Sequence, residues 1–264
     1  MNEVQENLLR MMVDLDRVLR EHKVYYALEY GTALGAVRHK GFIPWDDDLD
    51  VAIRREDVDR FREAVKDLPK GEYYLQEPLS IDWMNQFFKL RKNGTTAIEP
   101  DHLNTRMHQG LFIDVFILEK YPDSRFRRLL YNTVMTTEHI LQTISFKTYG
   151  KPGLDWLQKL FVKSVNLTDK LLDMLPEDHT EYLTYRLGEF KRLIRSRYAE
   201  GTTEVEFEGH TFSTFRDIPD RLTDYYGDYM ELPPEDQRVG DHLSVFRADM
   251  DYKDWLMQNR EAKE

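Results

Sequence analysis

The sequence predicts an α/β protein with a helical subdomain, and two patterns support this prediction. The first half alternates β-prone runs with short helical segments, whereas after Pro122 apolar residues recur at helical spacing over long stretches. With 264 residues, 41% of them hydrophobic and 12% aromatic, the chain can form a core, which excludes a largely disordered protein. We expect an α/β core at 1–121, a helical subdomain at 122–200 and a C-terminal segment at 201–264 that packs on the core.

Each element of the first half follows from a local pattern. Apolar residues from Leu8 to Leu19 recur every three or four positions between charged ones, which predicts an amphipathic helix over 4–22. Alternating and β-branched runs bounded by turn residues predict strands. The remaining predicted helices are 31–37 and 56–66, and the predicted strands are 24–29, 49–53, 73–76, 87–91 and 111–118.

The second half shows long helical periods. Three apolar series predict three helices: Phe126, Leu130 and Val134; then Leu157, Phe161 and Val165; then Leu183, Leu187, Phe190 and Ile194. Breaks are expected at 150–153, where glycine and proline cluster, and at Pro176. Two β-prone runs, 204–207 and 210–212, flank Glu208 and Gly209 and predict a hairpin.

Charge and cysteine content exclude several classes of function. Lysine and arginine total 37 against 48 acidic residues, giving a net charge of −11 that repels nucleic acid. The absence of cysteine excludes disulfides, thiolate-bound zinc and a cysteine nucleophile. The first residues resemble no secretory signal and no apolar run is long enough to span a bilayer, so we expect a cytoplasmic protein.

The segment from Tyr30 to Asp50 carries the chemistry. A glycine turn at Gly31 that opens a short helix presents backbone N–H groups to a phosphate, and Thr32 adds a hydroxyl. In a strand, Asp48 and Asp50 project to one face about 6–7 Å apart. Because adjacent carboxylates repel, a divalent cation such as Mg²⁺ would stabilise the pair. This combination favours phosphoryl transfer.

A third carboxylate completes the predicted metal site. Asp114 lies within an apolar run, where a charged residue is costly unless it is paired or bound to a metal. The alternative is a structural ion pair between Asp114 and Lys89 or Arg91. Lys89 and Arg91 stand at alternate positions of a predicted strand, so both side chains would project to the same face and could bind a diphosphate. Alternatively, they mark a solvated strand edge.

Further substrate contacts are predicted beside the aspartates. The candidates are Arg38, His39 and Lys40. Alternatively, Arg38 and Lys40 only offset the charges of the aspartates, and His39 is an ordinary surface residue.

Two other kinds of metal site would require the same aspartates. An EF-hand-like calcium loop would place carboxylates at positions 1, 3 and 5, but the glycine and glutamate it requires at positions 6 and 12 are replaced by Val51 and Asp57. An Asp-x-Asp glycosyltransferase site requires the same paired carboxylates. It does not explain Gly31 and Thr32.

At these residues the sequence resembles the LicD family, which includes phosphocholine transferases and fukutin-type phosphotransferases. Residues 30–50 resemble the family's signature almost throughout, and Phe112-Ile113-Asp114-Val115-Phe116 resembles its second motif. A C-terminal motif is matched by residues 226–230 and 232–234. The chain departs from the family at 117–119, where Ile-Leu-Glu follows the second motif.

The resemblance implies a nucleotidyltransferase-like mixed sheet and a metal-dependent transferase. It implies Mg²⁺, or Mn²⁺, held by Asp48, Asp50 and Asp114, and transfer of phosphocholine from CDP-choline to a hydroxyl of a teichoic acid or lipopolysaccharide precursor. A choline head would need an aromatic cage, because a quaternary ammonium makes no ordinary hydrogen bonds. The candidate cage residues, each of which is alternatively a core residue, are Tyr25, Tyr26, Trp45, Trp83 and Tyr121. Two alternatives stay open: transfer of ribitol phosphate or glycerol phosphate from a CDP donor, and a glycan- or phosphocholine-binding protein without activity. A lipid-linked acceptor would bring the protein to the inner face of a membrane, although the acidic composition offers no polybasic anchor.

Overall fold

The computed structural model describes residues 1–80, 83, 85–100, 107–148, 155–173, 180–185, 193–240 and 242–261. Within these residues, a mixed sheet with the strand order β3-β4-β6-β2-β1-β10-β9 forms the centre of the protein, and β7 extends it beside the end of β6. A second, two-stranded sheet pairs β11 with β5. The predicted α/β class with a mixed sheet is therefore confirmed.

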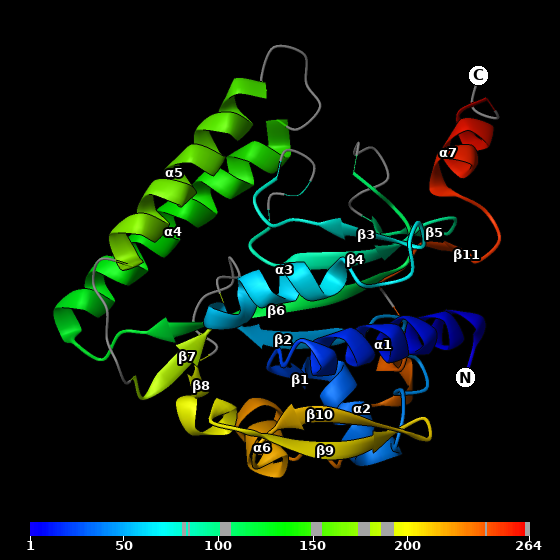
Figure 1. The fold of residues 1–264 in the computed structure, drawn as a ribbon, viewed down its shortest axis with the longest axis horizontal. Coiled ribbons are helices and arrows are strands. Elements are labelled where there is room, and N and C mark those ends of the chain that lie inside the picture. The colour runs from blue at the N-terminus through cyan, green and yellow to red at the C-terminus, as the bar shows by residue number, and fades with distance from the viewer. Residues whose placement is uncertain are drawn as a thin grey trace.

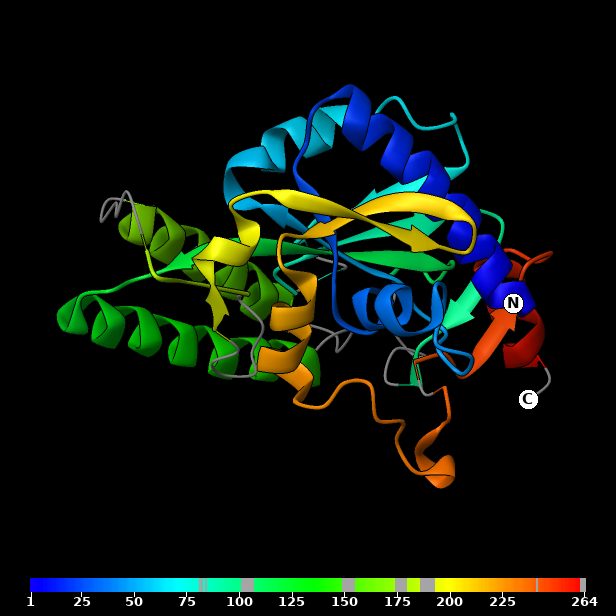
Figure 2. The same cartoon turned by 90° about the horizontal axis from the view of Figure 1, so that it is seen from below.

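Helices cover both faces of the sheet. Figures 1 and 2 show α1 and α3 on one face, α2 and α6 on the other, and the α4–α5 pair projecting beyond one end of the sheet. The helices are α1 Glu3–Glu21, α2 Tyr30–His39, α3 Val58–Val65, α4 Arg125–Thr148, α5 Asp155–Asp173, α6 Ile218–Tyr226 and α7 Tyr252–Glu261. The strands are β1 Tyr26–Leu28, β2 Asp50–Arg54, β3 Tyr73–Gln76, β4 Phe88–Lys92, β5 Thr96–Ile98, β6 Phe112–Tyr121, β7 Tyr182–Thr184, β8 Ile194–Arg195, β9 Thr202–Phe207, β10 His210–Phe215 and β11 Val245–Arg247.

The helix α1 confirms the amphipathic pattern. Its predicted apolar positions, including Leu8 and Leu19, are fully buried against the sheet. Asn2 and Gln5 form a capping box that satisfies two backbone N–H groups at the start of the helix. The Gln5 amide also donates to the backbone oxygens of Ile43 and Asp46, at 3.2 and 2.9 Å. This helix therefore also anchors the loop that precedes β2.

The strand β2 differs from expectation in its surroundings. The alternation over 49–53 predicts a half-buried strand with its aspartates at a solvent-facing edge, but β2 lies between β1 and β6, and Asp50 to Ile53 are all buried. Helices on both faces explain this burial. Asp48 precedes the strand, which begins at Asp50.

The second half partly contradicts the predicted helices. The first two are confirmed as α4 and α5, while the breaks expected at 150–153 and Pro176 lie outside the described residues. The third helix is wrong where the structure describes it, because Leu183 in β7 pairs with Ile194 in β8. Threonine and tyrosine at 180–185 favour a strand, and β7 adds to the free edge of β6.

The C-terminal part returns to the core. The predicted hairpin is confirmed as β9 and β10, in which Thr202 pairs with Phe215 at one end and Phe207 pairs with His210 at the turn. The strand β10 also lies parallel to β1. Within the described residues, no helix is both long enough and apolar enough to cross a membrane. The division into parts at 121 and 200 stays a prediction.

Candidate active site

The strands β2 and β6 bring two carboxylates side by side. The two strands are parallel neighbours, and Asp50 of β2 lies opposite Asp114 of β6. On the other side of β6, Lys89 in β4 lies opposite Asp114. Residues that are aligned across a sheet project to the same face, so Asp50, Asp114 and Lys89 form one row. Two of the three predicted catalytic residues thus meet through the sheet register.

The loop before β2 brings the third carboxylate to the same place. Thr32 in α2 accepts a hydrogen bond at 2.9 Å from the backbone N–H of Asp50, which fixes the start of the strand against the helix. A Cβ atom on Gly31 would lie 2.9 Å from Oδ2 of Asp46. Glycine at this position therefore lets the aspartate loop approach the first turn of α2. In this structure Gly31 and Thr32 hold the loop that carries Asp48.

The carboxylates raise one another's pKa. Burial raises the pKa of Asp50 well above its usual value, and the charges of Asp48, Asp114 and Asp46 raise it further. Burial also raises the pKa of Asp48, whereas His242 lowers it. The pKa of Asp114 rises to about 6, because burial outweighs the nearby positive charge of Lys89. The site therefore has a deficit of positive charge that a cation would relieve.

Lys89 lies inside the protein beneath this site. It is 1% exposed, and its Nζ lies 3.0 Å from Oδ1 of Asp114 and 3.0 Å from Oε1 of Glu99. The rings of Phe112 and Trp83 lie 3.4 and 5.0 Å from the ammonium group. The ion pair with Asp114, considered above as an alternative to a metal role for Asp114, is therefore present.

Arg91 has a structural position. It is fully buried, and it donates to the side chains of Gln76 and Glu99 and to the backbone oxygen of Gly110. Burial lowers its pKa. The charges of Lys89 and Arg91 are thus used within the protein, and the structure does not place either side chain on a surface where a diphosphate would bind.

Arg38, His39 and Lys40 lie at the C-terminal end of α2, opposite the end that carries Gly31. A ten-residue helix is about 15 Å long. Nη1 of Arg38 donates to the backbone oxygen of Tyr229 at 2.9 Å, and His39 packs edge-on to Trp45. Lys40 is exposed in the left-handed conformation that ends the helix. The structure does not gather these three side chains at the carboxylates.

His242 is a site residue that the sequence analysis missed. One ligand atom each from Asp46, Asp48 and His242 lie within 4.8 Å of one another, and Nδ1 of His242 is 3.4 Å from Oδ2 of Asp48. The backbone N–H of Leu243 donates to Asp47 at 3.1 Å, which holds the C-terminal segment over the aspartate loop. Nothing in the sequence links a histidine to aspartates almost two hundred residues away, because this proximity arises only from the tertiary fold.

The five predicted cage residues do not converge. Tyr26 donates to Asp16, Tyr25 stacks under Arg54, and Tyr121 packs against Tyr131 at the far end of β6. Trp83 contacts Lys89, and Trp45 lies under Arg238.

A different aromatic cluster lies beside the carboxylates. Phe116 is two residues after Asp114 and so projects to the same face of the sheet. Its ring centroid is 4.8 Å from that of Phe87 and 5.2 Å from that of Tyr30, and Tyr30 lies 5.5 Å from Tyr225 of α6. An aromatic surface therefore adjoins the start of α2.

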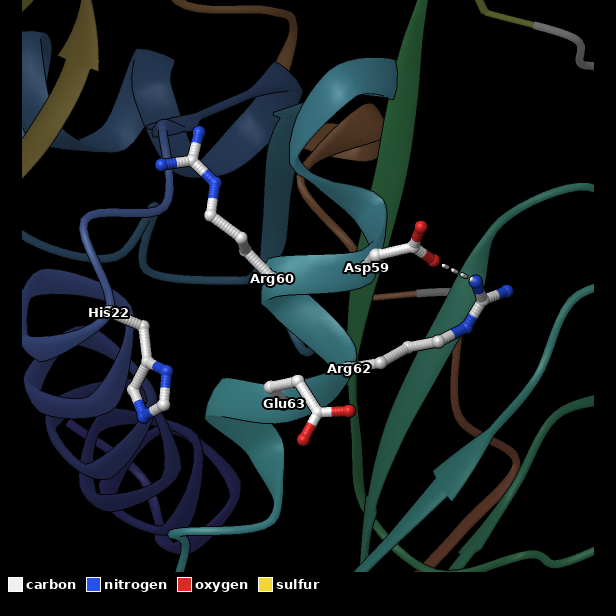
Figure 3. A pocket seen from close by; sticks show the side chains of 5 residues that line it. All are labelled: His22, Asp59, Arg60, Arg62 and Glu63. Carbon is white, nitrogen blue, oxygen red and sulfur yellow. Dashed lines mark hydrogen bonds and ion pairs between the residues drawn. The ribbon is translucent and has the colours of Figure 1, made fainter.

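A separate surface hollow of about 450 Å³ lies on the other face of the sheet, between α1 and α3 (Figure 3). It is lined by His22, Asp59, Arg60, Arg62 and Glu63. Its charged groups pair with each other or with neighbours, as in the 3.0 Å ion pair between Arg62 and Asp59. None of its lining residues belongs to the carboxylate site, so we assign this hollow no part in that site.

Comparisons with known proteins agree with this geometry. Residues 23–142, which contain α2, β2 and β6, match the family described as LicD/FKTN/FKRP, nucleotidyltransferase domain. The chain is also 27% identical to the lipopolysaccharide cholinephosphotransferase LicD of Haemophilus influenzae, over 84% of this chain and 88% of that protein. The chain therefore carries a LicD-family domain over residues 23–142, just under half of its length.

Two other proteins match over shorter stretches. An uncharacterized protein of Rickettsia prowazekii is 29% identical over 46% of this chain and 42% of its own length. An uncharacterized protein of Rickettsia typhi is 39% identical over 26% of this chain and 23% of its own length. The Haemophilus protein, in contrast, matches across nearly the full length of both chains.

Proposed function

We propose that this chain is a phosphotransferase that moves phosphocholine from CDP-choline to a hydroxyl of a cell-surface glycan precursor of the lipopolysaccharide or teichoic acid type. The observation that carries the proposal is the row of carboxylates in which buried Asp50 lies opposite half-buried Asp114, with buried Asp48 beside them, next to the first turn of α2. The name of the Haemophilus relative, with which the chain aligns over most of its length, supports the choice of phosphocholine.

The donor set fits a divalent cation. Asp48, Asp50 and Asp114, with Asp46 and His242 at the rim, would hold Mg²⁺ or Mn²⁺, because carboxylate oxygens suit both ions and imidazole is a common metal ligand. When bound, the cation would supply positive charge to the diphosphate of the donor. The raised pKa values of the carboxylates support this assignment, because a bound cation offsets their mutual repulsion.

We assign the proton transfer to Asp114. The acceptor hydroxyl would give its proton to the carboxylate while its oxygen forms a bond to the transferred phosphorus, and the bond from that phosphorus to CMP breaks. In the metal-free protein, burial raises the pKa of Asp114 to about 6, so this carboxylate accepts a proton more readily than an ordinary aspartate. Lys89, 3.0 Å from Oδ1, would hold the carboxylate in position.

We assign recognition of the choline group to the aromatic cluster around Tyr30. A quaternary ammonium has no N–H to donate, and aromatic faces attract it. Tyr30, Phe87 and Tyr225 are partly exposed next to the carboxylates, whereas Phe116 beneath them is buried. We place the protein in the cytoplasm, at the inner face of the membrane where a lipid-linked acceptor would lie.

The reaction is tested by incubating the full chain with CDP-choline, Mg²⁺ or Mn²⁺ and lipopolysaccharide-type or teichoic acid-type saccharides. We expect release of CMP that depends on the acceptor, together with a gain of phosphocholine mass on the saccharide. CDP-ribitol and CDP-glycerol should react at least about tenfold more slowly, since a polyol lacks the cation that aromatic faces bind. Reaction of these donors alone would assign the chain to phospho-polyol transfer, and phosphocholine binding without CMP release from any donor would contradict an enzyme.

The role of His242 is tested by metal titration. We expect His242→Ala to weaken Mn²⁺ binding by about tenfold, because it removes one group of the site while the carboxylates stay. The measurement is calorimetric titration of the protein with Mn²⁺ in the absence of any donor. His210→Ala, which changes an exposed histidine on β10, serves as the control. Unchanged affinity in His242→Ala would remove His242 from the site.

A further inference from the structure

The outward face of α4 is apolar where a solvent-exposed helix is normally charged. Phe126, Leu129 and Ile140 are 75%, 67% and 54% exposed, and Leu130 is exposed beside them. Leu129, Leu130 and Ile140 follow Phe126 by 3, 4 and 14 positions, which places all four along one side of the helix. Between Phe126 and Ile140, a stretch that the structure describes in full, every exposed position holds an apolar residue or a threonine.

The threonines of this face do not require water. Thr133, Thr136 and Thr137 donate their hydroxyl hydrogens to the backbone oxygens four residues earlier, at 2.7, 2.7 and 2.9 Å. This bonding satisfies the hydroxyls within the helix. The exposed face of α4 therefore has no polar hydrogen that water must satisfy, and it suits an apolar environment.

The neighbouring helix α5 adds aromatic and basic groups. Its exposed positions follow a helical period on one side of the helix, where apolar and basic side chains run in adjacent stripes. The apolar stripe consists of Trp156, Leu160 and Leu167, and the basic stripe consists of Lys159, Lys163 and Lys170. Lysine stems can lie along an apolar surface while the ammonium groups reach anionic groups above it.

The charge of the two helices is opposite to that of the whole protein. The residues of α4 and α5 include seven lysines and arginines against four acidic residues, whereas the chain as a whole has a net charge of −11. An anionic surface is complementary to this pair of helices. A second copy of the chain is a poorer partner, because a symmetric pairing through this face would bring its lysines opposite each other.

We propose that the α4–α5 helix pair docks on an anionic lipid bilayer, with Phe126 and Trp156 in the headgroup region and the lysines near the lipid phosphates. Large aromatic side chains favour this interface, and basic residues add attraction to anionic lipids. The pair projects beyond one end of the sheet, where it is free of the other helices (Figures 1 and 2). An anionic bilayer would be a partner of the proposed transferase. This proposal rests on the proposed function only for the statement that docking places the active site near a lipid-linked acceptor.

The test is cosedimentation of the full chain with vesicles, in the absence of any donor. We expect binding to phosphatidylcholine vesicles that contain about 30% phosphatidylglycerol, at least about tenfold weaker binding to pure phosphatidylcholine, and weakening of binding by salt. Leu129→Gln with Ile140→Gln should abolish binding, and Lys159→Glu with Lys163→Glu should remove the preference for the anionic lipid. The matched controls Met257→Gln and Lys66→Glu change exposed residues elsewhere and should bind normally.

A second measurement avoids the risk that a variant misfolds. Tryptophan fluorescence of the wild-type chain should shift to shorter wavelength when anionic vesicles are added, and Trp156→Phe should remove most of that shift. Equal binding to neutral and anionic vesicles, or formation of dimers with no vesicle binding, would overturn the proposal. Because no donor is present, a failure here is distinct from a failure of the proposed transfer reaction.

Discussion

Asp50→Asn is expected to abolish turnover and also to raise the melting temperature of the metal-free protein at pH 7. The carboxylate is buried beside Asp48, Asp114 and Asp46, and the neutral amide of nearly the same shape removes this repulsion. Loss of a group that acts on the reacting charges costs at least about a hundredfold in rate. A gain of about 1 kcal/mol would raise Tm by roughly 2–4 °C in a protein of this size.

The pH dependence of this variant follows from the direction of the shift. The folded protein holds the pKa of Asp50 above its unfolded value, so ionisation at neutral pH destabilises the fold and protonation relieves that cost. The Tm difference between Asp50→Asn and wild type should therefore be largest near pH 7. It should shrink as the pH falls toward about 4, where the unfolded carboxyl also becomes protonated.

The measurements are CMP release and calorimetric melting with and without Mn²⁺. Added Mn²⁺ should raise the Tm of the wild type and leave Asp50→Asn unchanged, since the variant lacks one proposed ligand. Asp59→Asn, at a position whose side chain is 96% exposed on α3, is the control and should match the wild type in both measurements. Full turnover in Asp50→Asn, or a lower Tm at pH 7, would contradict the assignment.

Local sequence patterns predicted most of the core but not all of the surroundings of the site. The helix over 4–22 and the strand at 73–76 follow from spacing alone, since apolar periodicity reports directly on which side of an element is buried. The spacing of Lys89 and Arg91 correctly places them on one strand. The spacing cannot show that both side chains are buried, because their burial depends on elements elsewhere in the chain.

Two errors show the same limit. Leu183 and Ile194 fit a helical period, yet the edge of β6 offers hydrogen bonds to a strand, and tertiary pairing outweighed the period. His242 reaches Asp48 only because the segment after α6 returns across the aspartate loop. The carboxylates of the candidate site were predictable because Asp48 and Asp50 are neighbours in sequence, whereas contacts between distant segments were not.

Arg221→Met is expected to produce the largest loss of stability. Arg221 in α6 donates to the carboxylate of Glu29, and both side chains are almost fully buried. Glu29 immediately precedes α2, and its backbone N–H donates to the oxygen of Asp50 at 3.0 Å. The ion pair therefore ties α6 to the junction of the helix and strand that form the site.

Removal of one partner leaves a buried charge without compensation, which costs about 3–5 kcal/mol. Burial already raises the pKa of Glu29 although Arg221 lowers it, so loss of the arginine should raise that pKa further. The single variant should therefore regain stability as the pH falls from 7 toward 5, because the folded state takes up a proton that the unfolded carboxyl does not. Urea unfolding at several pH values measures this effect.

The double variant Glu29→Gln with Arg221→Met separates the ion pair from the packing around it. Without the charge of Glu29, most of the loss should be recovered, because a neutral amide is far less costly to bury than an unpaired carboxylate. The control Arg197→Met breaks an exposed ion pair with Asp220 and should leave the unfolding midpoint unchanged. If the double variant were as unstable as Arg221→Met, the loss would lie in the contacts of the arginine with Phe215 and Tyr225 rather than in its charge.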